Sequence, residues 1–337
     1  MEMLRRTGFL CLTLLPLVLR GQEAGKPENP LRAGVSEVIV PVTVTDDKGR
    51  FVSNLHKEDF KLFDEGKEQS LTYFSADRSL PVVAGFLIDL SNSNRLRWKE
   101  FTDAITELIS AVMPEPKKYS GYLIGYSTEA ELMVNTTNDP EKLLDRIRKV
   151  KPGGGAALFD AVYMACTSRT LVNGEPIEPR RVIIVVGDGH DNASKKNLEE
   201  VLELAQRNLV TIYGVSTVAF GFNVDGEKNL NRLANATGGR VVYPLEGVYN
   251  DVSGYLSTPS DEGNYALKVG TGGYASAIMR GIVRAVEATA GEIQTQYILR
   301  YSPSESDVRR DYRKIRVDVS LPNVKVRARD GYFPYAP

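Results

Sequence analysis

The chain has 337 residues, of which 42% are hydrophobic and 25% are charged, and its formal net charge at pH 7 is −1. This is the composition of a folded protein with enough sequence for one large domain or two moderate ones. The charge balance argues against a general affinity for nucleic acid or for an anionic membrane surface, because either would need a basic excess or a long basic run. A partner therefore has to be inferred from a specific site.

The N-terminus has the features of a secretory signal peptide, which we place at residues 1–21. Arg5 and Arg6 precede an apolar stretch at residues 8–19, and polar sequence follows at once. The stretch is too short to persist as a membrane-spanning helix. We therefore expect an exported protein, in the periplasm, at the cell surface or secreted. Residues 22–34 are then a polar linker, and no stable transmembrane segment remains after cleavage.

The next segment, residues 35–78, is predicted to be a small antiparallel β module. Four valines recur at every second position of its first strand: Val38, Val40, Val42 and Val44. This period of two is typical of a strand with one buried face. Further strands are predicted around residues 60–63 and 71–74, with turn sequences at residues 46–49 and 65–66.

From about residue 79 the pattern changes to apolar strands that alternate with amphipathic helices, which we interpret as a domain spanning residues 79–292. VVAGFLIDL (82–90) and RVIIVVGD (181–188) are near-continuous apolar runs, as expected for strands covered on both faces. Shorter strands are predicted at residues 122–127, 131–134, 211–217 and 240–245, and helices near residues 98–112, 140–150, 157–169, 198–208, 228–236 and 278–286. The alternation predicts an α/β fold, a doubly wound and mostly parallel sheet with helices on both faces.

The end of the chain returns to the pattern of its beginning. Residues 246–275 are rich in Gly, Ser and Tyr and are interpreted as a loop or insertion within the α/β domain. The period of two then reappears in residues 293–335, with strands expected around residues 296–302, 315–321 and 324–328. These strands are too amphipathic for the buried sheet but match the N-terminal ones. We therefore expect both chain ends to build one small antiparallel β sandwich that flanks the inserted α/β domain.

Oxygen-bearing side chains follow the two most apolar strands. Asp89, Ser91 and Ser93 come at the end of the first strand, and Asp188 ends the second. If the two strands are neighbours, these side chains meet at the carboxyl edge of the sheet, where ligands bind in folds of this kind. Hard oxygens suit Mg²⁺, Ca²⁺ or Mn²⁺. The alternative is that the serines cap the following helix and that Asp188 is a turn residue ahead of a glycine.

Three segments of the sequence resemble the von Willebrand factor type A (VWA) domain. IDLSNS (88–93) resembles its DxSxS motif, KPGGGAALFDAV (151–162) resembles its glycine-rich loop, and VVGDGHDNAS (185–194) resembles its last loop. Their order, spacing and strand context agree over about 210 residues, which is more specific than any one motif. The flanking modules, at residues 42–75, 295–304 and 312–333, look like those of the exported VWA-related proteins of acidobacteria.

The resemblance implies a metal-ion-dependent adhesion site held by Asp89, Ser91, Ser93 and Asp188, with Mg²⁺, or else Ca²⁺ or Mn²⁺, as the ion. The partner is then a protein that offers an Asp or Glu carboxylate to complete the coordination. Two positions depart from the family: Ala156 stands where the family has threonine, and Gly187 replaces the usual threonine or serine. Two hypotheses stay open, an exported adhesion-type binding protein and a structural cell-envelope protein whose metal site no longer functions.

Other chemistry finds little support in the sequence. His190 and Asp191 lie near several serines, but no GxSxG elbow is present, so we do not expect an enzyme. The three glycines at residues 153–155 lack the GK[ST] sequence of a phosphate-binding loop. Cleavage of the signal would leave Cys166 as the sole cysteine, so no intramolecular disulfide is expected.

Overall fold

The computed structural model describes residues 37–76, 81–167, 180–217, 224–245, 271–303 and 311–334. These ranges belong to one compact unit, Gly34–Pro337. The predicted signal peptide and linker lie outside the described residues, as do residues 246–270 of the predicted insertion. None of the helices within the described ranges has the length and apolar character needed to cross a membrane.

The centre of the fold is a six-stranded sheet with the order β10-β9-β8-β5-β6-β7. Its strands are β5 (Val82–Asp89), β6 (Tyr119–Tyr126), β7 (Ala130–Thr137), β8 (Arg180–Val186), β9 (Thr211–Val215) and β10 (Val241–Val242). All neighbours are parallel except β6 and β7, which are antiparallel. The predicted α/β fold with a mostly parallel sheet is confirmed.

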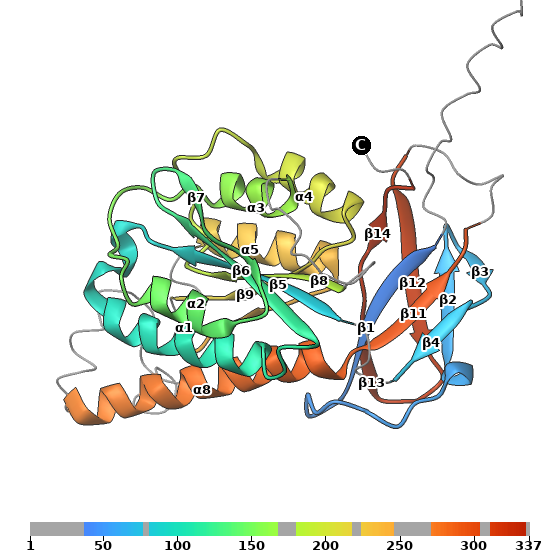
Figure 1. Ribbon diagram of the computed structural model, residues 1–337. Coiled ribbons are helices and arrows are strands. Elements are labelled where there is room, and N and C mark those ends of the chain that lie inside the picture. Colours follow the sequence, from blue (N-terminus) through green and yellow to red (C-terminus); the bar gives the residue numbers. More distant parts are fainter. Residues whose placement is uncertain are drawn as a thin grey trace, which may run out of the picture. The chain divides into compact units, whose positions relative to one another are not determined.

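Helices cover both faces of this sheet, as Figure 1 shows. They are α1 (Trp98–Val112), α2 (Pro140–Ile147), α3 (Leu158–Thr167), α4 (Leu198–Arg207), α5 (Val224–Thr237) and α8 (Thr271–Thr295), and a 3-10 turn, η2 (Asn92–Arg97), precedes α1. Apolar residues of α1, α2 and α8 pack on one face of the sheet, and those of α3, α4 and α5 pack on the other. All eight residues of β5 are buried, which explains its unbroken apolar sequence.

Local sequence explains where some helices begin. The side chain of Asp139 accepts a hydrogen bond from the backbone of Glu141, and Pro140 occupies the first helical position of α2. Asn197 and Glu200 form a reciprocal capping box at the start of α4. Both arrangements satisfy backbone N–H groups that a helix leaves unpaired at its start.

The two chain ends form a β sandwich of two four-stranded antiparallel sheets, with the orders β13-β1-β11-β4 and β14-β12-β2-β3. Its elements are β1 (Val38–Asp46), the 3-10 turn η1 (Lys57–Asp59), β2 (Phe60–Asp64), β3 (Lys67–Gln69), β4 (Tyr73–Ser75), β11 (Tyr297–Tyr301), β12 (Arg313–Val319), β13 (Val324–Arg327) and β14 (Gly331–Tyr332). The four alternating valines of β1 are buried in one core with Leu62 and Tyr301. N-terminal and C-terminal strands therefore pair as expected.

Two local predictions were wrong, and the short strand β3 was missed. α8 begins at Thr271, so residues 271–275, which we expected to be loop, are helical. Their glycines each cost a helix about 1 kcal/mol relative to alanine, so local composition favoured a loop. β10 covers only Val241–Val242 instead of residues 240–245. β3 was not predicted, because three polar and largely exposed residues carry no burial pattern.

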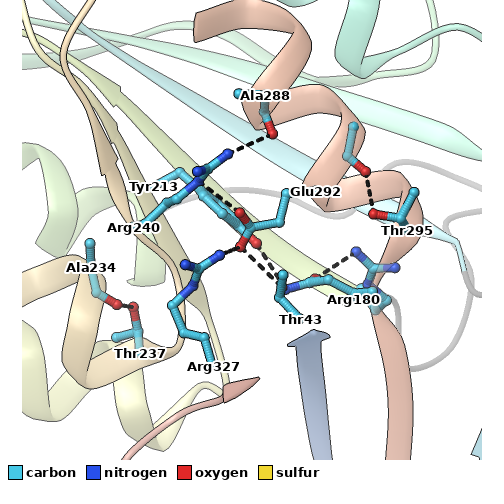
Figure 2. Close-up of polar contacts among 12 residues, drawn as sticks. Thr43, Arg180, Tyr213, Ala234, Thr237, Arg240, Ala288, Glu292, Thr295 and Arg327 are labelled. Atoms are coloured by element: carbon cyan, nitrogen blue, oxygen red, sulfur yellow. Dashed lines mark hydrogen bonds and ion pairs between the residues drawn. The ribbon is translucent and has the colours of Figure 1, made fainter. Parts of the chain in front are cut away.

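A buried carboxylate joins the end of α8 to the sandwich (Figure 2). Glu292, with 0% of its surface exposed, accepts a hydrogen bond from Thr43 of β1 at 3.0 Å. It also forms ion pairs with Arg327 of β13 and, at 2.8 Å, with Arg240 ahead of β10. Gln296 extends the contact by donating a hydrogen bond to Tyr213 of β9 at 2.9 Å. Polar side chains from both parts of the fold thus meet at this junction.

Candidate functional site

The parallel register places the predicted site residues at one edge of the sheet. β5 and β8 are neighbours, with Ile88 opposite Val186. Asp89 and the segment that contains Asp188 therefore leave the sheet together at its carboxyl edge. Asp89 is 1% exposed and Asp188 is 8% exposed. The expectation that the two apolar strands are neighbours is confirmed.

Asp89 is a buried carboxylate with only part of its hydrogen-bonding capacity used. Its Oδ1 accepts a hydrogen bond from the backbone N–H of Ser91 at 2.8 Å, whereas its buried Oδ2 has no hydrogen-bond partner. Burial raises the pKa of Asp89 to about 6, against the lowering effect of the hydrogen bonds from Ser91, and the charge of Asp188 adds to the rise. An unpaired buried oxygen is uncommon in native proteins and calls for a partner.

Ser91 and Ser93 contact each other directly. Their Oγ atoms are 2.7 Å apart, with Ser91 buried and Ser93 exposed. Ser91 precedes η2 in the capping position, yet its side chain makes no capping hydrogen bond. The alternative that Ser91 serves as a helix cap is therefore wrong. Its hydroxyl instead lies beside that of Ser93.

Asp188 does have the turn role that we considered as an alternative. Its Oδ1 accepts a hydrogen bond from the backbone N–H of His190 at 2.9 Å. Gly189 follows with φ +81°, and a β-carbon there would lie 2.2 Å from the backbone oxygen of Gly226. The glycine is thus required by both its conformation and its close packing. A turn role leaves the second carboxylate oxygen of Asp188 for other contacts.

Hydrogen bonds tie the glycine-rich loop to the loops on either side of it. The backbone N–H of Gly153 donates to the carbonyl of Leu90 at 2.6 Å. Ala156 donates its backbone N–H to the side-chain oxygen of Asn192 at 2.8 Å, and its carbonyl accepts from the N–H of Asn192 at 3.0 Å. Hydrogen bonds therefore join three segments that are distant in the sequence and that all carry parts of the resemblance.

The last loop is also anchored to the start of α3. Asp191 accepts hydrogen bonds from the backbone N–H of Phe159 at 2.9 Å and from the hydroxyl of Ser194 at 2.6 Å. These contacts occupy the carboxylate that a hydrolase would need to orient His190, whose side chain is exposed. The structure gives Asp191 a role in holding the loop.

Gly187 and Tyr126 explain one departure from the family pattern. A β-carbon at position 187 would lie 2.4 Å from the hydroxyl of Tyr126 and 2.8 Å from the β-carbon of Asp89. Serine or threonine therefore cannot fit at this position without a shift of its neighbours. Tyr126 is 1% exposed, and its hydroxyl has no hydrogen-bond partner. Sequence reasoning missed this residue, although its place at the end of a predicted strand was a signal.

The residues present fit a hard divalent cation. The described part of the chain contains no group of three or more His, Cys, Asp or Glu side chains arranged to hold a metal. The set at this edge is different, with two carboxylates and two hydroxyls, and Asp89 contributes a buried oxygen without a partner. Oxygen donors of this kind suit Mg²⁺, Ca²⁺ or Mn²⁺, and water can fill coordination positions that the protein leaves open.

Comparison with known families agrees with this geometry. The sequence model of the von Willebrand factor type A domain matches residues 85–247. This chain contains a VWA domain. The match includes both aspartates, both serines and the glycine-rich loop of the site. No curated protein matches the chain. The likeness of the flanking modules to acidobacterial proteins stays a prediction.

Several solved structures are similar to the chain. One is proximal thread matrix protein 1 from the mussel byssus with zinc in its MIDAS motif, at 18% identity and a TM-score of 0.43, covering 53% of this chain and 46% of that one. Another is a von Willebrand factor type A protein from Catenulispora acidiphila, at 12% identity and a TM-score of 0.40, covering 66% and 52%. A third is BatB from Bacteroides thetaiotaomicron, at 16% identity and a TM-score of 0.38, covering 59% and 98%. The chain spans about half the length of the first two proteins.

Proposed function

We propose that this protein is a non-enzymatic binding protein that captures an acidic group of a partner protein through a divalent cation. The ion is held by Asp89, Ser91, Ser93 and Asp188. The single observation that carries the proposal is the buried Oδ2 of Asp89, which has no hydrogen-bond partner and lies at the sheet edge that β8 leaves just before Asp188. A cation supplies the interaction that this oxygen lacks.

The roles of the four residues follow from their contacts. The backbone N–H of Ser91 fixes Oδ1 of Asp89, so that Oδ2 is the oxygen left to face the ion. Asp188 brings a second negative charge, which opposes ionisation of Asp89 until a cation is present. Ser93 is exposed, so the cluster is open to solvent on its side. When bound, the ion supplies a positive charge with coordination positions for a partner's carboxylate.

Mg²⁺ is the ion that we propose, with Ca²⁺ and Mn²⁺ as alternatives. Mg²⁺ binds through a few protein oxygens and keeps several of its waters. A water can therefore occupy the place of the threonine hydroxyl that Ala156 lacks. A softer ion is less favoured, because the four proposed ligands contain no sulfur or nitrogen donor.

Export is a further part of the proposal and is supported by the charged and apolar pattern of residues 1–21. The test is expression of the full chain in a bacterial host, followed by fractionation and intact-mass measurement. A periplasmic or extracellular product that lacks about 21 residues supports export. A cytoplasmic product of full mass contradicts it.

Partner capture can be tested with poly-L-glutamate as an acidic probe and poly-L-glutamine as its neutral counterpart. We expect the protein to bind immobilised poly-L-glutamate in Mg²⁺ but not in chelator, and to ignore poly-L-glutamine. Asp89→Ala should abolish this binding. Asp145→Ala is the matched control, because Asp145 is an exposed carboxylate on α2 that pairs with Arg148 at 3.1 Å. Binding that persists in chelator would refute capture through the ion.

A structural role in the cell envelope is the second candidate. It is favoured by Ala156, which lacks the threonine hydroxyl of the family and leaves the site with one protein ligand fewer. Sedimentation velocity of the wild type, Asp89→Ala and a deletion within residues 246–270 separates the candidates. Self-assembly that needs the segment but not Asp89 supports the structural role. A monomer in all three proteins contradicts it.

A further inference from the structure

Tyr126, Asp89 and Gly187 lie in one row across the sheet. Tyr126 is the last residue of β6 and is paired in register with Asp89, the last residue of β5. Gly187 follows Val186, which pairs with Ile88 on the other side of β5. Residues in register on parallel neighbours point to the same face, because side chains alternate along every strand. The phenol therefore stands beside the carboxylate of Asp89.

Two buried oxygens without hydrogen-bond partners face the same small space. They are the hydroxyl of Tyr126 and Oδ2 of Asp89. A β-carbon on Gly187 would lie 2.4 Å from the hydroxyl oxygen of Tyr126 and 3.1 Å from Oδ2 of Asp89. Both oxygens are therefore next to the space that a side chain at position 187 would occupy. A buried oxygen without a hydrogen-bond partner is uncommon in native proteins. Two such oxygens beside each other indicate that they share a partner, or that they form a hydrogen bond with each other when an ion is bound.

The phenol is suited to donate to this carboxylate. A tyrosine hydroxyl ordinarily ionises at about pH 10, so it carries its proton at neutral pH and can donate a hydrogen bond. A carboxylate that binds a cation is ionised and accepts hydrogen bonds at both oxygens. Only Oδ1 of Asp89 has a donor, the N–H of Ser91. A neutral phenol next to Oδ2 can donate a hydrogen bond to this oxygen while the same oxygen faces the cation.

We propose that Tyr126 is a positioning residue of the metal site: when the ion is bound, its hydroxyl donates to Oδ2 of Asp89 and holds this carboxylate in place for the cation. The inference rests on the proposed metal site. This role also accounts for Gly187. The family has a hydroxyl-bearing side chain at this position, just after β8. Here the hydroxyl of Tyr126, from β6, occupies that space. Tyr126 orients a ligand and does not itself touch the ion.

Tyr126→Phe tests the proposal, because it removes the hydroxyl and keeps the ring. Tyr122→Phe is the matched control. Tyr122 lies on the same face of the same strand, is also buried, and donates to the carbonyl of Ala165 at 3.4 Å, away from the site. Thermal unfolding of the full chain is measured in chelator and across a Mg²⁺ titration for the wild type and both variants.

We expect Tyr126→Phe to raise the Mg²⁺ concentration that gives half of the stabilisation by about tenfold or more, as for other residues that orient metal ligands. In chelator its unfolding midpoint should equal or exceed that of the wild type, because the change removes an unpaired buried hydroxyl. Tyr122→Phe should leave the Mg²⁺ dependence unchanged. A purely structural tyrosine would lower the midpoint in chelator and not alter the Mg²⁺ dependence.

The outcomes separate this inference from the proposed function. If the wild type responds to Mg²⁺ and Tyr126→Phe responds at the same concentrations, Tyr126 has no positioning role and the metal site stands. If the wild type does not respond to Mg²⁺, Mn²⁺ or Ca²⁺, the metal site is refuted and the role of Tyr126 is refuted with it.

Discussion

The hydroxyl of Tyr126 lies where a side chain at position 187 would begin. A β-carbon on Gly187 would be 2.4 Å from this oxygen, closer than real β-carbons approach any atom. The tyrosine at the end of β6 therefore requires a residue without a β-carbon at position 187 in the last loop. Because the tyrosine is fully buried, it has no room to swing aside at low cost.

Gly187→Ala should lower the free energy of unfolding by about 1–3 kcal/mol, the usual cost of overpacking a buried site. Tyr126→Phe should recover part of this loss, since it removes the closest contact, while the contact with the β-carbon of Asp89 remains at 2.8 Å. Urea unfolding of both single variants and the double variant gives the coupling free energy. Strictly additive effects would show that the two positions do not collide.

Asp89→Asn should stabilise the ion-free protein at pH 8. The pKa of Asp89 is raised from 3.8 to about 6, so folding favours the protonated form. Protonation of Asp89 in the folded state thus contributes to the free energy of unfolding. This contribution is fully present below about pH 3.8 and is lost as the pH rises through about 6. The loss amounts to about 3 kcal/mol. Asparagine carries no charge at any pH, so the Asp89→Asn protein does not undergo this loss of stability.

Urea unfolding in chelator checks this prediction at pH 8 and at pH 4. Asp89→Asn should be more stable than the wild type at pH 8, and the difference should shrink at pH 4. Asp145→Asn, which changes an exposed carboxylate, serves as the control. An Asp89→Asn protein that is less stable at pH 8 would mean that the carboxylate is stabilising without an ion.

Ala156→Thr should restore the hydroxyl that the family has in the glycine-rich loop. The backbone of Ala156 is already held by two hydrogen bonds with Asn192, so the new side chain enters a fixed loop. One more protein ligand should lower the Mg²⁺ concentration for half-stabilisation by roughly tenfold. The same midpoint in a Mg²⁺ titration as in the wild type would indicate that position 156 does not face the ion.

Glu292→Gln should destabilise the fold by about 3 kcal/mol, because it leaves Arg240 and Arg327 without their shared buried carboxylate. Glu203→Gln is the matched control. Glu203 pairs with Arg207 at 2.6 Å on the surface of α4, and its loss should cost no more than about 1 kcal/mol. Equal effects in urea unfolding would show that the junction of α8 with the sandwich contributes no more than a surface pair.

The elements with strong periodicity could be predicted because burial dictates their residues. The valines at alternate positions of β1 share one buried face, and the unbroken apolar run of β5 follows from helices on both faces. These runs also predict that the strands before Asp89 and Asp188 are neighbours, and the parallel register confirms it, although β8 ends at Val186, two residues before Asp188.

Features that depend on long-range contacts could not be predicted. The role of Ser91 was ambiguous, because a serine before a helix is also a common cap, and only the structure shows that its side chain makes no cap hydrogen bond. Tyr126 was seen as part of a strand, since nothing local shows that its hydroxyl stands beside Asp89. The glycines at the start of α8 weakened a helical pattern that the structure nevertheless continues.

The most direct test of the central claim is a count of bound ions. Mn²⁺ is paramagnetic and gives a spin-resonance signal when free in solution, so the bound fraction can be measured during a titration of the full chain. We predict a single Mn²⁺ per chain, displaced by excess Mg²⁺ and absent from Asp89→Ala. If all Mn²⁺ stays free, or if Asp89→Ala binds it as the wild type does, the oxygen cluster at Asp89 is not a metal site.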